Sequence, residues 1–109
     1  MSISGALSSV VSGLTDNMVR LAAAANNIVN AQTADYAASQ VQSSTVASVQ
    51  AGGGTYTPGG VQPIILEDGA VDIATEFVRM ILAENAYRAN IETIRTAEEM
   101  SRELIDIKT

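Results

Sequence analysis

The segment from Asp72 to Lys108 constrains the fold more than any other part of this chain, because a helical apolar pattern runs through it. Apolar residues recur at steps of three and four, which is the period of a helix face and not of a strand. We predict one long helix with an apolar stripe formed by Ile73, Phe77, Met80, Ile81, Tyr87, Ile91 and Ile94, and continued after a small shift around the axis by Ala97, Met100, Leu104 and Ile107.

Charged residues favour the same helix. Asp72 is a good N-cap residue, Glu76 places a negative charge in the first turn, and Arg102 and Lys108 suit the C-terminal end. Opposite charges also lie three or four residues apart, and an exposed pair of this kind contributes about 0.2–0.5 kcal/mol. Such pairs support a helix but cannot hold a fold; they are Glu76/Arg79, Glu84/Arg88, Arg88/Glu92, Arg95/Glu99 and Glu98/Arg102.

The length of this helix implies a partner. At about 1.5 Å per residue it measures roughly 55 Å, which is longer than a compact domain of this mass can bury. The chain has only 109 residues, so its own core is thin, and oligomerisation is the natural way to cover the stripe.

Composition excludes several functional classes. The chain has no cysteine and no histidine, which removes disulfides, the usual zinc ligands and the commonest general base. No catalytic constellation is recognisable, so we predict neither enzymatic activity nor a metal, a cofactor or a small-molecule substrate. The net charge of −6 disfavours nucleic acid and anionic membrane surfaces as partners.

The N-terminal sequence lacks the positive region and the continuous apolar core of a secretory signal peptide. The longest apolar run of the N-terminal half, Leu21 to Ala25, is far shorter than the roughly 20 residues that span a bilayer. We expect neither a cleaved signal nor a transmembrane segment.

A second amphipathic helix is predicted near the N-terminus, where apolar residues again alternate at steps of four and three. Its few charges suggest that it is buried on more than one face in its working state. Gly13 weakens it and implies either a kink or a close contact. Its predicted interface residues are Leu7, Val10, Leu14, Leu21 and Ile28.

The middle of the chain, residues 37 to 63, is rich in Ser, Thr, Gln, Val and Gly. Val41 to Val49 and Thr55 to Val61 flank a glycine triplet and predict a short hairpin, although a mobile linker is equally compatible. Ile64 to Leu66 follow as a short buried strand or anchor. The predicted fold is mainly α: two long helices packed as an antiparallel, coiled-coil-like pair and joined by a short β-hairpin or irregular segment. The expected segments are residues 1–36, 37–70 and 71–109.

Both ends of the chain resemble the axial proteins of the bacterial flagellum, most closely the small rod proteins of the basal body. The N-terminal similarity includes Asn26, Asn27, Asn30, Thr33 and Tyr36. The C-terminal similarity is stronger and includes Asp72, Glu76, Tyr87, Asn90, Thr96 and Met100. The family usually has Pro-Gly before the tyrosine, where this chain has Ala34-Asp35. The first helix therefore either ends near Thr33 or continues towards Ser39.

This resemblance implies a structural subunit that assembles with itself and with homologous rod proteins into the tubular, torque-transmitting drive shaft of the periplasmic rod. It also implies export through the flagellar type III apparatus without a cleaved signal. The short middle segment favours a proximal rod position. The alternative is a free-standing helical adaptor or chaperone-like binding protein. On the rod interpretation, the second helix contributes Phe77, Met80, Tyr87, Ile91, Ile94, Met100 and Leu104 to the assembly interface.

Overall fold

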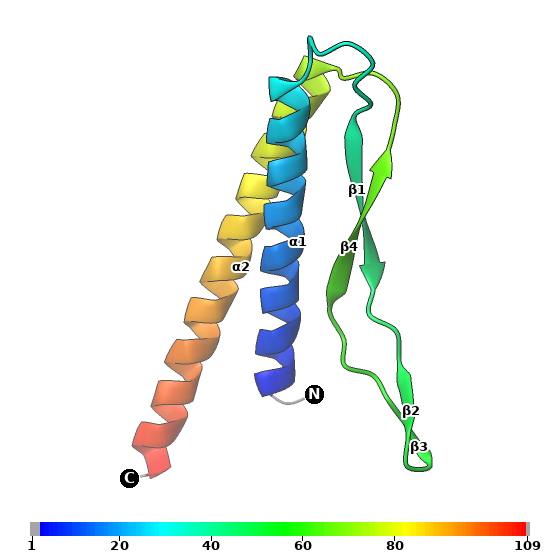
Figure 1. Cartoon of the computed structure of the whole chain (residues 1–109). Helices are drawn as coiled ribbons and strands as arrows, with labels where there is room; N and C mark the ends of the chain where they lie inside the picture. Colours follow the sequence, from blue (N-terminus) through cyan, green and yellow to red (C-terminus); the bar gives the residue numbers. More distant parts are fainter. Residues whose placement is uncertain (1–2, 109) are drawn as a thin grey trace.

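The computed structural model describes residues 3–108. The chain begins with helix α1 (Ile3–Val29), continues through strands β1 (Ser39–Thr45), β2 (Val49–Ala51), β3 (Gly54–Tyr56) and β4 (Val61–Glu67), and ends with helix α2 (Ile73–Lys108). The helices run in opposite directions and the strands form a narrow ribbon beside α1 (Figure 1). In the described chain α1 packs on both α2 and the β1–β4 ribbon, so it is the central element.

Helix α2 starts where its sequence predicts. One carboxylate oxygen of Asp72 accepts a hydrogen bond from the Ala74 backbone N–H (3.2 Å), and the other accepts from the Thr75 hydroxyl (2.8 Å). These bonds satisfy groups at the helix N-terminus that have no partner inside the helix. Asp72 is therefore the N-cap.

Helix α1 ends at Val29, so it does not continue towards Ser39. The chain then turns: the Tyr36 backbone N–H donates to the Thr33 carbonyl (3.4 Å), which closes a four-residue turn. Asp35 is the third residue of this turn and has a φ of 57°, a left-handed conformation that glycine adopts most easily. A Pro-Gly pair at positions 34 and 35 would suit this turn.

The strands form one long, interrupted antiparallel hairpin. Strand β1 pairs with β4 from Ser39↔Glu67 to Thr45↔Val61, and β2 pairs with β3 from Val49↔Tyr56 to Ala51↔Gly54. Gly52 and Gly53 have positive φ values and make the tight turn between β2 and β3. The expectation that Ile64 to Leu66 form a buried strand is wrong in one respect: they lie in β4, but all three are exposed.

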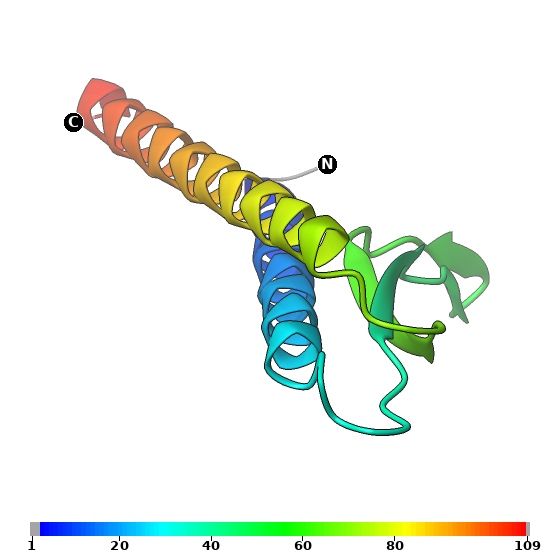
Figure 2. The same ribbon diagram turned by 90° about the horizontal axis from the view of Figure 1, so that it is seen from above.

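The expected mainly α, coiled-coil-like architecture is wrong. The connection between the helices is an antiparallel β ribbon that packs on α1 as a separate layer, and the two helices cross and diverge instead of winding around each other (Figures 1 and 2). The buried residues of α2 are Glu76 and Ala83, whereas Phe77 and Ile81 of the predicted stripe are exposed. A coiled coil needs large apolar residues along the contact line.

Small residues explain why the helices cross closely at one place. A Cβ atom at Gly13 of α1 would lie 3.0 Å from the Asn90 side-chain nitrogen of α2, so only glycine fits there without displacing Asn90. The buried apolar residues are also small, since they are Ala24, Ala38, Val41 and Ala83. The largest apolar side chains remain outside this core.

Candidate assembly interface

The residues that the sequence assigns to an assembly interface divide into two groups. One group is half-buried within the chain and consists of Leu7, Val10, Leu14, Ile28, Met80, Tyr87 and Ile94. The other group is exposed and consists of Leu21, Phe77, Ile91, Met100 and Leu104. The first group therefore contributes to the fold of the chain itself, and the second group is free to contact other molecules.

A contiguous apolar face lies on the N-terminal third of α2. Phe77, Val78, Ile81 and Leu82 are adjacent on the helix surface, and each is more than half exposed. Apolar exposure returns near the C-terminal end at Met100, Leu104, Ile105 and Ile107. Extended apolar surface of this kind on a small domain is typical of a protein–protein contact.

Helix α1 carries an exposed apolar face whose residues are not among the predicted interface residues. Val11, Met18 and Val29 are exposed, and their spacings of seven and eleven residues place them on one side of the helix. The same spacing was readable in the sequence. The spacing alone does not distinguish this face from the stripe that faces the rest of the chain, because both have the same helical period.

The motif near the end of α1 forms a buried hydrogen-bond network. Asn27 is fully buried, and its amide oxygen accepts from the Ser39 backbone N–H (2.8 Å). Its amide nitrogen donates to the Ser39 carbonyl (2.8 Å), and the Tyr36 hydroxyl donates to the same Asn27 oxygen (3.2 Å). The Asn27 side chain thus pairs with both backbone groups of Ser39, the first residue of β1, as a residue of a neighbouring strand would.

The other motif residues complete this turn. Asn26 donates from its amide to the Tyr36 hydroxyl (3.2 Å), and Asn30 donates to the Asn26 carbonyl (2.9 Å). The Thr33 hydroxyl donates to the Asn30 amide oxygen (3.2 Å). The five N-terminal motif residues therefore meet in one network, and their structural role is to fix the chain reversal after α1.

The C-terminal motif residues are spread along α2. Asp72 caps the helix, Glu76 is buried, and Asn90 faces Gly13 of α1. Tyr87 is half-buried, whereas Thr96 and Met100 are exposed. The structure therefore does not gather these residues into one site.

Two further contacts fasten the ribbon to α1. The Ser12 hydroxyl accepts from the Val61 backbone N–H (3.0 Å) at the start of β4. Between the two ends of the ribbon, the Ser43 hydroxyl donates to the buried Asp16 carboxylate (2.7 Å). Together with the Asn27–Ser39 bonds, these contacts hold the β1–β4 ribbon against α1 along its length.

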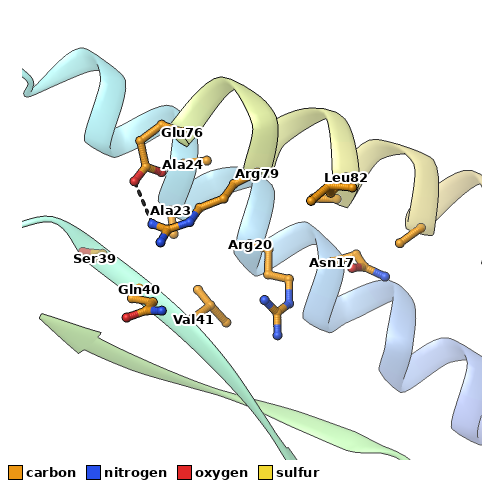
Figure 3. A pocket seen from close by; sticks show the side chains of 12 residues that line it. Asn17, Arg20, Ala23, Ala24, Ser39, Gln40, Val41, Glu76, Arg79 and Leu82 are labelled. Carbon is orange, nitrogen blue, oxygen red and sulfur yellow. Dashed lines mark hydrogen bonds and ion pairs between the residues drawn. The ribbon is translucent and has the colours of Figure 1, made fainter. Parts of the chain in front are cut away.

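A groove of about 290 Å³ lies where α1, α2 and β1 meet (Figure 3). Two arginines line it, and each is paired with a buried carboxylate: Arg79 with Glu76 at 2.9 Å, and Arg20 with Asp16 at 3.0 Å. Each arginine–carboxylate pair therefore has no net charge. The second oxygen of Glu76 is buried and has no hydrogen-bond partner among the described residues.

Two negative findings apply to the described residues, 3–108. None of their helices combines the length and apolarity needed to cross a bilayer. They also contain no group of three acidic, histidine or cysteine side chains arranged to hold a metal ion.

Comparison with known proteins agrees with the resemblance seen at the two termini. Residues 65–107 match the family described as flagellar basal body rod FlgEFG protein C-terminal. The flagellar hook protein FlgE of Escherichia coli (strain K12) is 36% identical over 92 residues, which cover 81% of this chain and 22% of that protein. The flagellar hook protein FlgE of Caulobacter vibrioides (strain ATCC 19089 / CIP 103742 / CB 15) is 40% identical over 50 residues, covering 46% of this chain and 8% of that protein.

These similarities define the class of this chain as a structural component of the flagellum. The chain belongs to the flagellar rod and hook family, and the resemblance predicted from the motifs is confirmed. It spans 22% and 8% of the length of the two hook proteins that it matches.

Proposed function

We propose that this chain is a structural subunit of the flagellar basal-body rod, which assembles with itself and with homologous axial proteins into a tubular drive shaft. The observation that carries this proposal is the exposed apolar surface on both helices, with Val11 and Met18 on α1 and Phe77 and Ile81 on α2. In a chain of the rod and hook family, such faces are best used by burial against neighbouring subunits.

The mechanical role follows from the shape of the helices. Helix α2 has 36 residues, and the chain extends over 62 Å in its longest dimension but only 13 Å in its shortest. When long, thin subunits are staggered in a tube, bending or twisting the tube must tilt many helices against their neighbours. Close packing resists such tilting, so the tube is stiff enough to carry torque.

Position and delivery are part of the proposal. The short connection between the helices supports a proximal rod position, and the family membership supports export through the flagellar type III apparatus into the periplasm. We further propose that residues 1–36 and 71–109 act together as the axial core. Residues 37–70 then serve as a connecting segment at the side of α1.

Sedimentation of the purified chain tests self-assembly. The proposed function predicts that rising protein concentration converts monomers into large polymers, which electron microscopy shows as rods or filaments. A monodisperse monomer or dimer at every concentration, including in mixtures with homologous rod proteins, would contradict the proposal and favour the free-standing adaptor.

A further inference from the structure

The hairpin formed by β2 and β3 is an arm that makes no packing contact within its own described chain. We define the arm as residues 47–57, all of which are exposed. No other helix or strand packs on β2 or β3. The arm projects beyond the N-terminal end of α1, away from the place where the two helices meet (Figure 1).

The arm is nevertheless braced internally. The hydroxyls of Ser48 and Thr57 share a hydrogen bond across the hairpin (2.9 Å), and the Gln50 amide donates to the Thr55 hydroxyl (3.0 Å). Val49 and Tyr56 are directly opposite each other in the strand register, so their side chains share one face. Tyr56 is 65% exposed and Val49 is 54% exposed. A pre-ordered arm loses little entropy when it binds.

Charge makes the arm suitable for contact between copies of this chain. Each copy carries a net charge of −6, so copies repel one another in general. Residues 36–66, however, contain no charged side chain. The arm can therefore approach another copy without bringing a like charge with it or burying an unpaired one.

The groove between α1, α2 and β1 has the complementary chemistry. The guanidinium groups of Arg20 and Arg79 are held in place by Asp16 and Glu76, and their side chains are 37% and 40% exposed. Planar guanidinium groups stack well on aromatic rings. Val41, Leu82 and Ala83 supply an apolar lining beside them (Figure 3).

The arm and the groove cannot meet within one chain. The groove is lined by Ser39 to Val41 at the start of β1, whereas the arm lies beyond the other end of the β1–β4 ribbon (Figure 1). We propose that the arm of one copy docks in the groove of the next copy, with the Val49–Tyr56 face inwards and the Tyr56 ring against the arginines. This inference rests on the proposed self-assembly and deepens it. A contact between two different surfaces repeats without closing when the rotation between copies allows it, and it then produces a filament.

Cysteine cross-linking tests this contact directly, because the chain has no cysteine of its own. Ala51→Cys lies on the same face of the arm as Val49, and Gln40→Cys lies in the groove. Oxidation of the double variant in its polymers should give a ladder of disulfide-linked dimers, trimers and larger species on a non-reducing gel. The matched control combines Ala51→Cys with Glu99→Cys, an exposed position on α2 outside the groove.

Each outcome of this experiment decides a different point. A ladder with Gln40→Cys and only background cross-linking with Glu99→Cys supports the arm contact. If polymers form but the Gln40 pair cross-links no better than the Glu99 pair, the arm proposal is overturned and the proposed function stands. If no polymers form at any concentration, self-assembly fails and the arm proposal fails with it.

A second measurement uses the chemistry of position 56. Tyr56→Ala should raise the concentration needed for polymerisation at least tenfold, whereas Tyr56→Phe, which keeps the ring, should stay within about threefold of the parent. Thr55→Ser, on the opposite face of β3, keeps the hydroxyl that accepts from the Gln50 amide, so it is the control and should also change little. Equal behaviour of Tyr56→Ala and the parent would exclude the arm from the interface.

Discussion

Gly13 of α1 and Asn90 of α2 face each other where the helices cross, and a Cβ atom on Gly13 would lie 3.0 Å from the Asn90 side-chain nitrogen. Two effects therefore oppose each other when alanine replaces this glycine. In a helix interior alanine is more favourable than glycine by about 1 kcal/mol. At this position, however, its Cβ atom crowds the side-chain amide of Asn90. Asn90 is one of the C-terminal motif residues, so this crossing involves a residue of that motif.

A double-mutant cycle separates these two effects. Gly13→Ala should stabilise the Asn90→Ala variant by about 1 kcal/mol, because only the helix propensity term then remains. In the parent the gain should be smaller by at least about 0.5 kcal/mol. Urea unfolding of the four proteins measures both values, and equal gains in the two backgrounds would show that the helices do not meet at this pair.

Asn27 and Asn26 are adjacent asparagines with very different roles. Asn27→Ala removes the partners of both the Ser39 N–H and the Ser39 carbonyl, which are part-buried, and leaving such groups unpaired costs about 1–3 kcal/mol. Asn26 is exposed, so Asn26→Ala should cost less than about 1 kcal/mol. Thermal unfolding of the two variants provides the comparison, and a reversed order would contradict the network described for Asn27.

The turn before Tyr36 should tolerate glycine at position 35 and proline at position 34. Asp35→Gly should stabilise the chain by about 0.5–1 kcal/mol, because the φ of 57° suits glycine. Ala34→Pro should cost little, since α1 has already ended at Val29 and proline suits the second position of such a turn. The control is Ala25→Pro, which interrupts the helix and should cost about 3 kcal/mol or more. A comparable loss for Ala34→Pro and Ala25→Pro would mean that the helix extends past Val29.

Part of this fold was predictable from the sequence for local reasons. The three- and four-residue apolar spacing and the capping residue Asp72 are local signals, and they placed α2 within one residue of its observed start. The end of α1 was harder to predict, because neither glycine nor proline stands at Ala34-Asp35. The turn there depends on side-chain hydrogen bonds between residues as far apart as Asn26 and Tyr36.

The helix packing was not predictable because two different faces share one period. Met80 and Phe77 both belong to the predicted stripe, yet Met80 is half-buried and Phe77 is 52% exposed. Which side of the stripe faces α1 depends on tertiary contacts such as the close approach of Gly13 and Asn90. The groove was missed because Arg20, Arg79 and Val41 come from three separate segments.

The charge pairs on α2 should matter little for assembly. Glu84 and Arg88 form an ion pair at 2.7 Å with side chains that are 53% and 73% exposed, so exchanging the two residues should change the free energy of unfolding by at most about 0.5 kcal/mol. Circular dichroism should show the same helix content. Loss of polymerisation in this exchange variant alone would identify the charged face as a subunit interface.

Occupancy of the chain in isolated basal bodies tests the central claim most directly. Basal bodies would be purified from cells that produce the parent, the Glu84/Arg88 exchange variant, or a variant with both Phe77→Gln and Ile81→Gln, and the chain would be located in the rod by electron microscopy. Glutamine is a good helix former, so the double variant should fold and be exported. Because it loses Phe77 and Ile81 from the exposed apolar face of α2, it should be absent from the rod, whereas the parent and the exchange variant should be present. Equal occupancy of the double variant, or absence of the parent from the rod, would contradict assembly through these faces.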